Sequence, residues 1–179
     1  MDHHAWLTCA TLALLAATSL PAWSQDRPST QPAPPTDTLV TEGTVAAPPA
    51  EVWKVFSTAE GFRRLGVAHC DFDLRIGGLI RAHYDPNGVL GDDGTIHNEI
   101  LAYEPERMIS FRVHQPPKGF PFDRQTWSRT WSVVTLTDLG DGRTHVRIVG
   151  LGYPDTEDGR KMREFFRTGN GWVLQFLQR

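Results

Sequence analysis

Apolar and polar residues alternate with a period of two through the middle of the chain, between residues 66 and 153. In one segment Phe72, Leu74 and Ile76 are separated by charged residues, which predicts a strand with one buried face and one solvated face. Gly77 and Gly78 follow, and they predict a break or a bulge in that strand.

Further segments of the same kind predict a curved antiparallel sheet of six or seven strands. Ile109, Phe111 and Val113 mark an inward-facing phase in one of them. Turn residues at 85–88, 91–94 and 140–142 separate consecutive strands, as antiparallel hairpins require. Apart from the segment around Phe72, the strands are expected at 39–46, 79–84, 96–103, 108–114, 127–136 and 144–151.

A helical period appears at both ends of this region. Pro49 suits the first turn of a helix over residues 49–56, and Ser57 with Glu60 forms a capping-box pattern for a second short helix. Residues 158–179 predict a long helix with a wide apolar stripe. The stripe comprises Met162, Phe165, Phe166, Gly169, Val173, Phe176 and Leu177.

One long helix and one antiparallel sheet must bury each other's apolar faces, so the predicted fold class is α+β. The C-terminal helix is expected to lie across the concave side of the sheet. The space between helix and sheet is then the natural place for a cavity.

The amino-terminal 38 residues differ in pattern from the rest. Residues 1–24 contain an apolar run that is shorter than the ~20 residues of a membrane-spanning helix, followed by small residues at Ala22 and Ser24, as in an export signal. The proline-rich segment 25–38 predicts a disordered tether. The folded domain is therefore expected at 39–179, in a periplasmic or secreted protein with no membrane span after signal cleavage.

Composition excludes several functional classes. The formal charge of −3 gives no support for binding nucleic acid. The two cysteines cannot build a disulfide scaffold or a four-cysteine zinc site. The five histidines that follow the signal, His69, His83, His97, His114 and His145, lack the close spacing of common metal sites, so neither a metal nor another cofactor is expected.

Several short motifs, in order, resemble the SRPBCC superfamily, whose helix-grip fold is shared by START domains, polyketide cyclases and the birch pollen allergen. The most similar branch comprises homologues of the activator of the 90-kDa heat-shock protein ATPase. The matching segments are 47–53, 73–78, 100–105, 142–152 and 171–172. The resemblance implies the helix-grip fold but transfers no catalytic residue. An exported protein would not meet a cytosolic chaperone, so that activity is not expected.

The sequence offers few candidates for catalysis. Asp71 and Asp73 are compatible with acid and base roles, but the alternation favours a solvated outer face. No Gly-x-Ser-x-Gly elbow is present. Cys70 is interpreted as a bystander thiol on the face that is poor in apolar residues.

Candidate ligand contacts come from the aromatic residues. In a strand over 127–136, Trp127, Arg129 and Trp131 would share one face, either as an aromatic and cationic platform for a ligand head or as edge packing. Val134 and Leu136 favour the opposite phase as the inner one. The residues proposed to bind a ligand are Phe72, Phe111, Arg129, Trp131, Phe166 and Trp172.

Two further features bear on the predicted cavity. Gly169 and Gly171 lie inside the last helix, where each costs about 1 kcal/mol relative to alanine. These glycines either leave room for a ligand or let the helix bend over the mouth of the cavity. Alternatively, they allow the helix to pack closely on the sheet beside Trp172. The loop 114–125 is either a rim or lid of the cavity, or packs on the outside.

The sequence thus predicts an exported protein that binds a small hydrophobic or amphipathic molecule between sheet and helix. One alternative is a cyclase, dehydratase or hydrolase that uses the same cavity, with His97, Glu99 or Arg129 pointing into it. Another is an interaction module of the cell envelope, which would need an exposed apolar patch.

Overall fold

The computed structural model describes residues 37–179. The predicted signal segment 1–24 and nearly all of the predicted tether 25–38 lie outside the described residues. Within the described part, no helix has both the length and the apolar character needed to cross a membrane.

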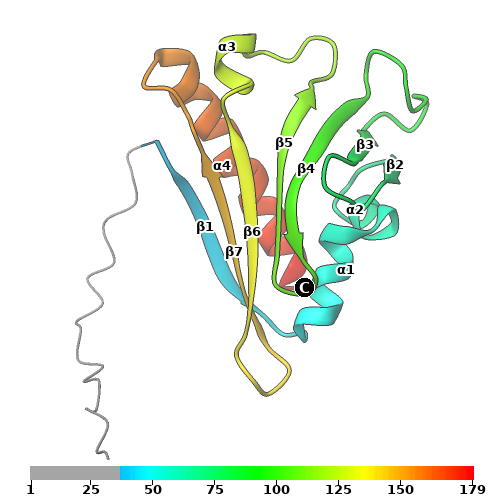
Figure 1. Ribbon diagram of the computed structural model, residues 1–179, viewed down its shortest axis with the longest axis vertical. Coiled ribbons are helices and arrows are strands. Elements are labelled where there is room, and N and C mark those ends of the chain that lie inside the picture. Colours follow the sequence, from blue (N-terminus) through cyan, green and yellow to red (C-terminus); the bar gives the residue numbers. More distant parts are fainter. Residues whose placement is uncertain (1–36) are drawn as a thin grey trace, which may run out of the picture. The chain divides into compact units, whose positions relative to one another are not determined.

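A single antiparallel sheet of seven strands forms the centre of the domain, in the order β1-β7-β6-β5-β4-β3-β2. Figure 1 shows that the sheet is curved. The predicted strand number and the predicted antiparallel pairing are confirmed. The strands are β1 (Leu39–Val45), β2 (His69–Phe72), β3 (Leu79–His83), β4 (Ile96–Glu104), β5 (Met108–Gln115), β6 (Trp131–Asp138) and β7 (Thr144–Leu151).

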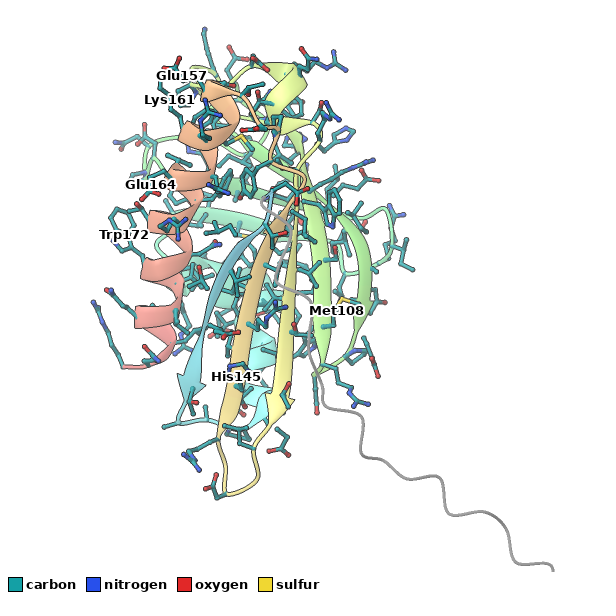
Figure 2. All side chains as sticks on the ribbon, turned by 90° about the vertical axis from the view of Figure 1, so that its left-hand side faces the viewer. Met108, His145, Glu157, Lys161, Glu164 and Trp172 are labelled. Atoms are coloured by element: carbon teal, nitrogen blue, oxygen red, sulfur yellow. The ribbon has the colours of Figure 1, made fainter. Side chains whose placement is uncertain are left out.

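Four helices accompany this sheet: α1 (Pro49–Ser57), α2 (Ala59–Arg64), α3 (Arg124–Trp127) and α4 (Glu157–Leu177). The long helix α4 runs along one face of the sheet, where it contacts β1 and β7 (Figures 1 and 2). This arrangement confirms the α+β class and the helix-grip fold.

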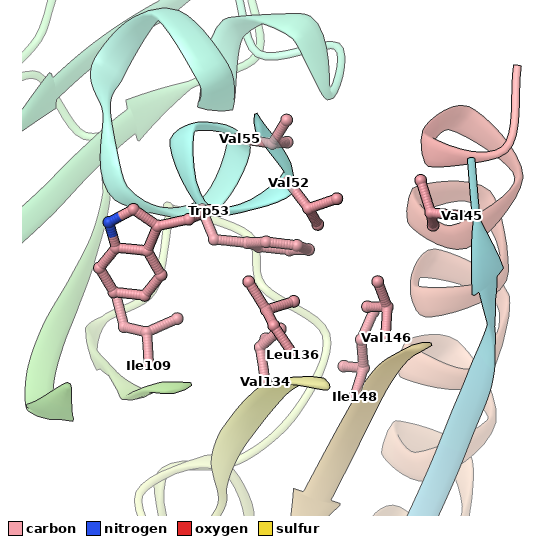
Figure 3. Packing of buried hydrophobic residues seen from close by; sticks show 10 residues of the cluster. Val45, Val52, Trp53, Val55, Ile109, Val134, Leu136, Val146 and Ile148 are labelled. Atoms are coloured by element: carbon pink, nitrogen blue, oxygen red, sulfur yellow. The ribbon is translucent and has the colours of Figure 1, made fainter. Parts of the chain in front are cut away.

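The main core lies where α1 crosses the sheet. Pro49 occupies the first turn of α1, as predicted. Four residues of this helix, Val52, Trp53, Val55 and Phe56, are buried, and Figure 3 shows Val52 and Trp53 on the side of the helix that faces the strands. They pack against the inner side chains Ile109, Val134, Leu136, Val146 and Ile148.

Two smaller cores lie beside the main one. Val67, Cys70, Ile80, Ala82 and Ile100 form a core under α2. Leu39, Tyr153 and Met162 form another where the first half of α4 meets β1, and Trp127 of α3 packs against it. The domain thus has three apolar clusters. Phe111 and Val173 pack against the edge of the main one, and Phe166 packs against the third, so the space between the sheet and the middle of α4 is bordered by two of them.

The strand predicted around Phe72 is shorter than expected. It ends at Phe72, and Leu74 and Ile76 are 37% and 69% exposed, so their predicted burial is wrong. The chain turns instead, with the Gly78 amide donating to the Arg75 carbonyl at 2.8 Å. Gly77 has a φ of 75°, which favours glycine and ends the extended backbone.

The placement of Cys70 also differs from the expectation. Cys70 precedes Phe72 by two residues, so both point to the same face of β2, and Cys70 is buried among apolar side chains. Burial raises the pKa of its thiol to about 11, against smaller opposing effects of Arg63. Its thiolate is therefore scarce at neutral pH.

The segment 127–136 is only partly a strand. Residues 124–127 form the short helix α3, whose Asp123 side chain accepts a hydrogen bond from the Thr126 amide at 2.7 Å. The strand β6 starts at Trp131. Trp127 and Trp131 therefore do not share a sheet face, and the predicted platform around Arg129 is wrong.

The start of α2 is capped by Thr58 rather than by Ser57. The Thr58 hydroxyl accepts a hydrogen bond from the Gly61 amide at 3.0 Å and donates to the Lys54 carbonyl at 2.7 Å. Ser57 is still inside α1 and is buried. The helix α2 is therefore capped one residue later than the sequence pattern predicts.

Replacing Thr58 by alanine is expected to lower the free energy of unfolding by about 1 kcal/mol, because the Gly61 amide loses its cap. Urea denaturation of Thr58→Ala and of the matched variant Ser57→Ala measures this. A larger loss in Ser57→Ala than in Thr58→Ala would contradict the assignment of the cap.

Candidate functional site

A cavity of about 860 Å³ lies between the sheet and α4. Its volume falls in the range of roughly 300–1,000 Å³ that small-molecule sites usually occupy. The strands β4 to β7, the helices α2 and α4, and the loop after β5 all contribute to its wall.

The sheet wall follows from the alternation of side chains along three strands. Phe111 and Val113 of β5, Ser132 and Val134 of β6, and Ile148 of β7 all face the cavity. On β5 and on β6 the two lining residues are two positions apart, and the cross-strand register places Phe111 opposite Ser132. The inward phase predicted for β5 is thus confirmed.

The helix wall is the apolar stripe of α4. Phe166, Gly169, Val173 and Phe176 line the cavity at helical spacing. A Cβ atom added at Gly169 would meet no atom within 4 Å, so close packing does not explain this glycine. Gly169 leaves open space in the wall of the cavity.

Gly171 differs from Gly169 in its position. It also has open space around an added Cβ atom, but it does not line the cavity. The neighbouring Trp172 is 70% exposed and lies at the margin of the cavity, on the outer side of α4 in Figure 2. Neither glycine is therefore required for close packing beside Trp172.

The loop after β5 forms part of the rim. Pro116, Pro117 and Phe120 border the cavity. Phe120 and Phe122 contact Phe165 of α4 edge to face, with ring centroids 6.2 Å and 5.6 Å apart. Of the two predicted placements, the structure has the loop at the rim.

Polar groups in the wall are few. The only charged lining residues among residues 37–179 are Arg64 and Arg179, both basic. The guanidinium of Arg64 lies 5.7 Å from the centre of the Phe176 ring. The uncharged polar lining side chains are Tyr84, Asn98, Ser132, Thr168 and Asn170.

The six residues predicted to bind a ligand are not all brought together. Phe111, Phe166 and Trp172 border the cavity, Trp172 at its margin. Phe72 packs in the cores under α1 and α2 instead. Trp131 borders a small neighbouring hollow of about 50 Å³, and Arg129 borders neither space.

The side chains proposed for chemistry in the cavity lie elsewhere. Asn98 lines the cavity, whereas its neighbours His97 and Glu99 do not. Glu99 instead pairs with Arg112 at 2.9 Å, between neighbouring strands. Burial lowers the pKa of His97, and the charges of Arg81 and His114 add to this effect.

The two aspartates considered for acid and base roles form ion pairs with nearby arginines. Asp71 pairs with Arg81 across β2 and β3, and Asp73 pairs with Arg75 at 2.7 Å. Within residues 37–179 no three side chains of metal-binding type come close enough to hold an ion.

Sequence analysis missed the polar and apolar residues that complete the wall. The positions Val173 and Phe176 were in the predicted stripe but were not assigned to a site. The phase of β4 was unresolved, because Ile96, Asn98 and Ile100 do not alternate cleanly with polar residues. Arg64 and Arg179 carried no local signal, since only the tertiary fold brings α2 near the end of α4.

Comparison with solved structures gives similar folds at low sequence identity. A protein of Mesorhizobium loti is 23% identical with a TM-score of 0.62, and the match covers 79% of this chain and 93% of that one. An HSP90 activator from Plasmodium falciparum is 18% identical with a TM-score of 0.56, covering 78% and 90%. The Aha1 dimer from Colwellia psychrerythraea is 12% identical with a TM-score of 0.58, covering 79% and 96%.

No curated protein matches the sequence. The sequence profile of the family described as Activator of Hsp90 ATPase homolog 1-like protein, however, matches residues 46–178. This range runs from the end of β1 to the end of α4 and so includes almost all of the domain described above. The chain belongs to the Activator of Hsp90 ATPase homolog 1-like family, a branch of the SRPBCC superfamily.

Proposed function

We propose that this protein binds a small hydrophobic or amphipathic molecule in the cavity between the sheet and α4. The proposal rests on the cavity of about 860 Å³, whose wall consists mostly of aliphatic and aromatic side chains. Moving an apolar chain from water into such a space releases about 0.8 kcal/mol for each methylene group that is buried.

The wall also explains why an apolar ligand is favoured over a purely polar one. Val113, Val134 and Ile148 on the sheet and Val173 on α4 offer no hydrogen-bonding side-chain atoms. A polar molecule placed against them would lose its hydrogen bonds to water without replacement. The few polar lining groups suit the orientation of one end of a ligand.

The open space at Gly169 supports the same function. A helix interior normally avoids glycine, which costs about 1 kcal/mol there relative to alanine. At this position the missing side chain enlarges the cavity between Phe166 and Val173. The open space supports a role in making room for a ligand, and close packing does not explain the glycine.

We also propose that the protein is exported before it binds its ligand. The apolar run at 12–20 and the small residues Ala22 and Ser24 support a cleavable signal. HSP90 activation is the activity of the Plasmodium falciparum relative and belongs to that protein. A chain outside the cytosol would use the same fold for another purpose.

A series of straight-chain alcohols from octanol to dodecanol tests the binding proposal. The affinity of the purified protein should rise about fourfold for each added methylene, as displacement of a bound fluorescent probe measures. Binding should also raise the melting temperature. If no alcohol displaces the probe or raises the melting temperature, the proposed function is wrong.

A further inference from the structure

We propose that the ligand is an amphiphile with an anionic head, and that Arg64 and Arg179 hold this head at one end of the cavity. The inference rests on the proposed function, because it specifies which class of amphipathic molecule the cavity takes. Its basis is the charge of the lining residues and the place of the two arginines in the fold.

Arg64 lies beside the last turns of α4. This residue ends α2, and its guanidinium lies over the ring of Phe176, 5.7 Å from the ring centre. This cation–π contact uses the face of the ring and leaves the guanidinium N–H groups free to donate hydrogen bonds. Among residues 37–179, no carboxylate forms an ion pair with Arg64. Its donors are therefore available to a ligand.

The second cation lies at the same end of the cavity. Arg179 follows Phe176 by three residues, at the end of α4, and both line the cavity. The contact between Arg64 and Phe176 places the end of α2 beside the last turns of α4. The two arginines thus belong to one end of the cavity: Arg64 contacts the Phe176 ring, and the Arg179 amide donates to the Phe176 carbonyl at 3.3 Å.

Acidic side chains do not compensate these two charges in the described part of the wall. Among the lining residues in the described part of the chain there is no aspartate or glutamate. The whole chain nevertheless carries more acidic than basic residues, with a formal charge of −3. The charged side chains of the cavity wall are therefore both basic, in a protein with a mildly acidic formal charge.

These features fit a single alkyl chain with a carboxylate or phosphate head. The chain would occupy the apolar space along Val173 and Gly169, and the head would accept hydrogen bonds from arginine. Both arginines are exposed, so each should contribute modestly to the affinity for an anionic head. A cationic head would face two like charges and should be rejected.

The experiment compares four ligands with the same alkyl chain: dodecanoate, dodecyl phosphate, dodecanol and dodecyltrimethylammonium. Probe displacement with the purified protein at neutral pH should give about tenfold tighter binding of dodecanoate than of dodecanol. The cationic ligand should bind most weakly. The preference should shrink as salt is added, because both arginines are solvent-accessible. Comparison of dodecanoate with dodecyl phosphate distinguishes a fatty acid from a phosphate-headed lipid as the source of the anion.

Variants then assign the preference to the two residues. Arg64→Gln and Arg179→Gln should each reduce the ratio of dodecanoate to dodecanol affinity about threefold, and the double variant should bring it near one. Arg167→Gln is the control, because Arg167 lies on α4, pairs with Glu164 and does not line the cavity. The ratio removes any effect of a variant on binding of the alkyl chain itself.

The outcomes separate this inference from the proposed function. If the alcohol and the anions bind equally well, or if Arg64→Gln and Arg179→Gln leave the ratio unchanged, the anionic head is wrong while cavity binding stands. If none of the four ligands binds, both are wrong.

Discussion

Replacing Gly61 by alanine is expected to lower the free energy of unfolding by about 2–3 kcal/mol. An added Cβ atom would lie 2.2 Å from the Lys54 carbonyl oxygen and 2.4 Å from the Val55 Cα atom. Both atoms belong to the backbone of α1, so no side chain can rotate away, and α2 must shift. Urea denaturation with analysis by linear extrapolation measures the loss.

Gly171→Ala is the matched control for this prediction. It makes the same substitution in a helix, but the new Cβ atom at position 171 has open space around it. Alanine should therefore stabilise α4 there by about 1 kcal/mol through its higher helix propensity. The two variants should change stability in opposite directions. A Gly61→Ala protein as stable as the unchanged protein would show that α1 and α2 are not in close contact.

The parts of the fold that sequence predicted are those in which a single period repeats without interruption. Ile109, Phe111 and Val113 alternate with polar residues, and the strand β5 follows with the expected face inward. The stripe from Met162 to Leu177 covers several helical turns, and α4 forms over nearly the same residues. In both cases burial of a whole apolar face decides the local structure.

The errors occur where a local backbone feature overrides the pattern. The alternation of apolar and polar residues runs on from Phe72 to Ile76, although the strand ends at Phe72. The chain turns there, and Gly77 adopts the left-handed conformation that this turn requires. Similarly, the side chain of Asp123 caps α3 and so removes Trp127 from the strand that its aromatic character predicts. A period in the sequence cannot reveal either event.

The site was less predictable than the fold, because its residues come from elements that are distant in the sequence. The strand and helix phases already indicated Phe111 and Phe166 as wall residues, and both border the cavity. The end of the cavity that carries Arg64 and Arg179 depends on the contact between α2 and the last turns of α4, which are more than 100 residues apart in the sequence. No periodicity encodes such a contact, so Arg64 and Arg179 emerge only from the structure.

Replacing Gly169 by tryptophan is expected to weaken dodecanol binding about 50-fold. The new side chain would start from the cavity stripe of α4, between Phe166 and Val173, and would enter the open space. An indole there displaces about three methylene groups of the ligand, each worth about 0.8 kcal/mol of transfer free energy. Displacement of a bound fluorescent probe measures the affinity.

The fold should survive this change, because an added Cβ atom at Gly169 meets nothing within 4 Å and tryptophan has a higher helix propensity than glycine. A melting temperature no lower than that of the unchanged protein is the check. Gly171→Trp is the matched control: it places the same side chain on the same helix, two residues away and outside the cavity wall. It should bind dodecanol normally. If Gly169→Trp also binds dodecanol with unchanged affinity, the ligand does not occupy the space between the sheet and α4.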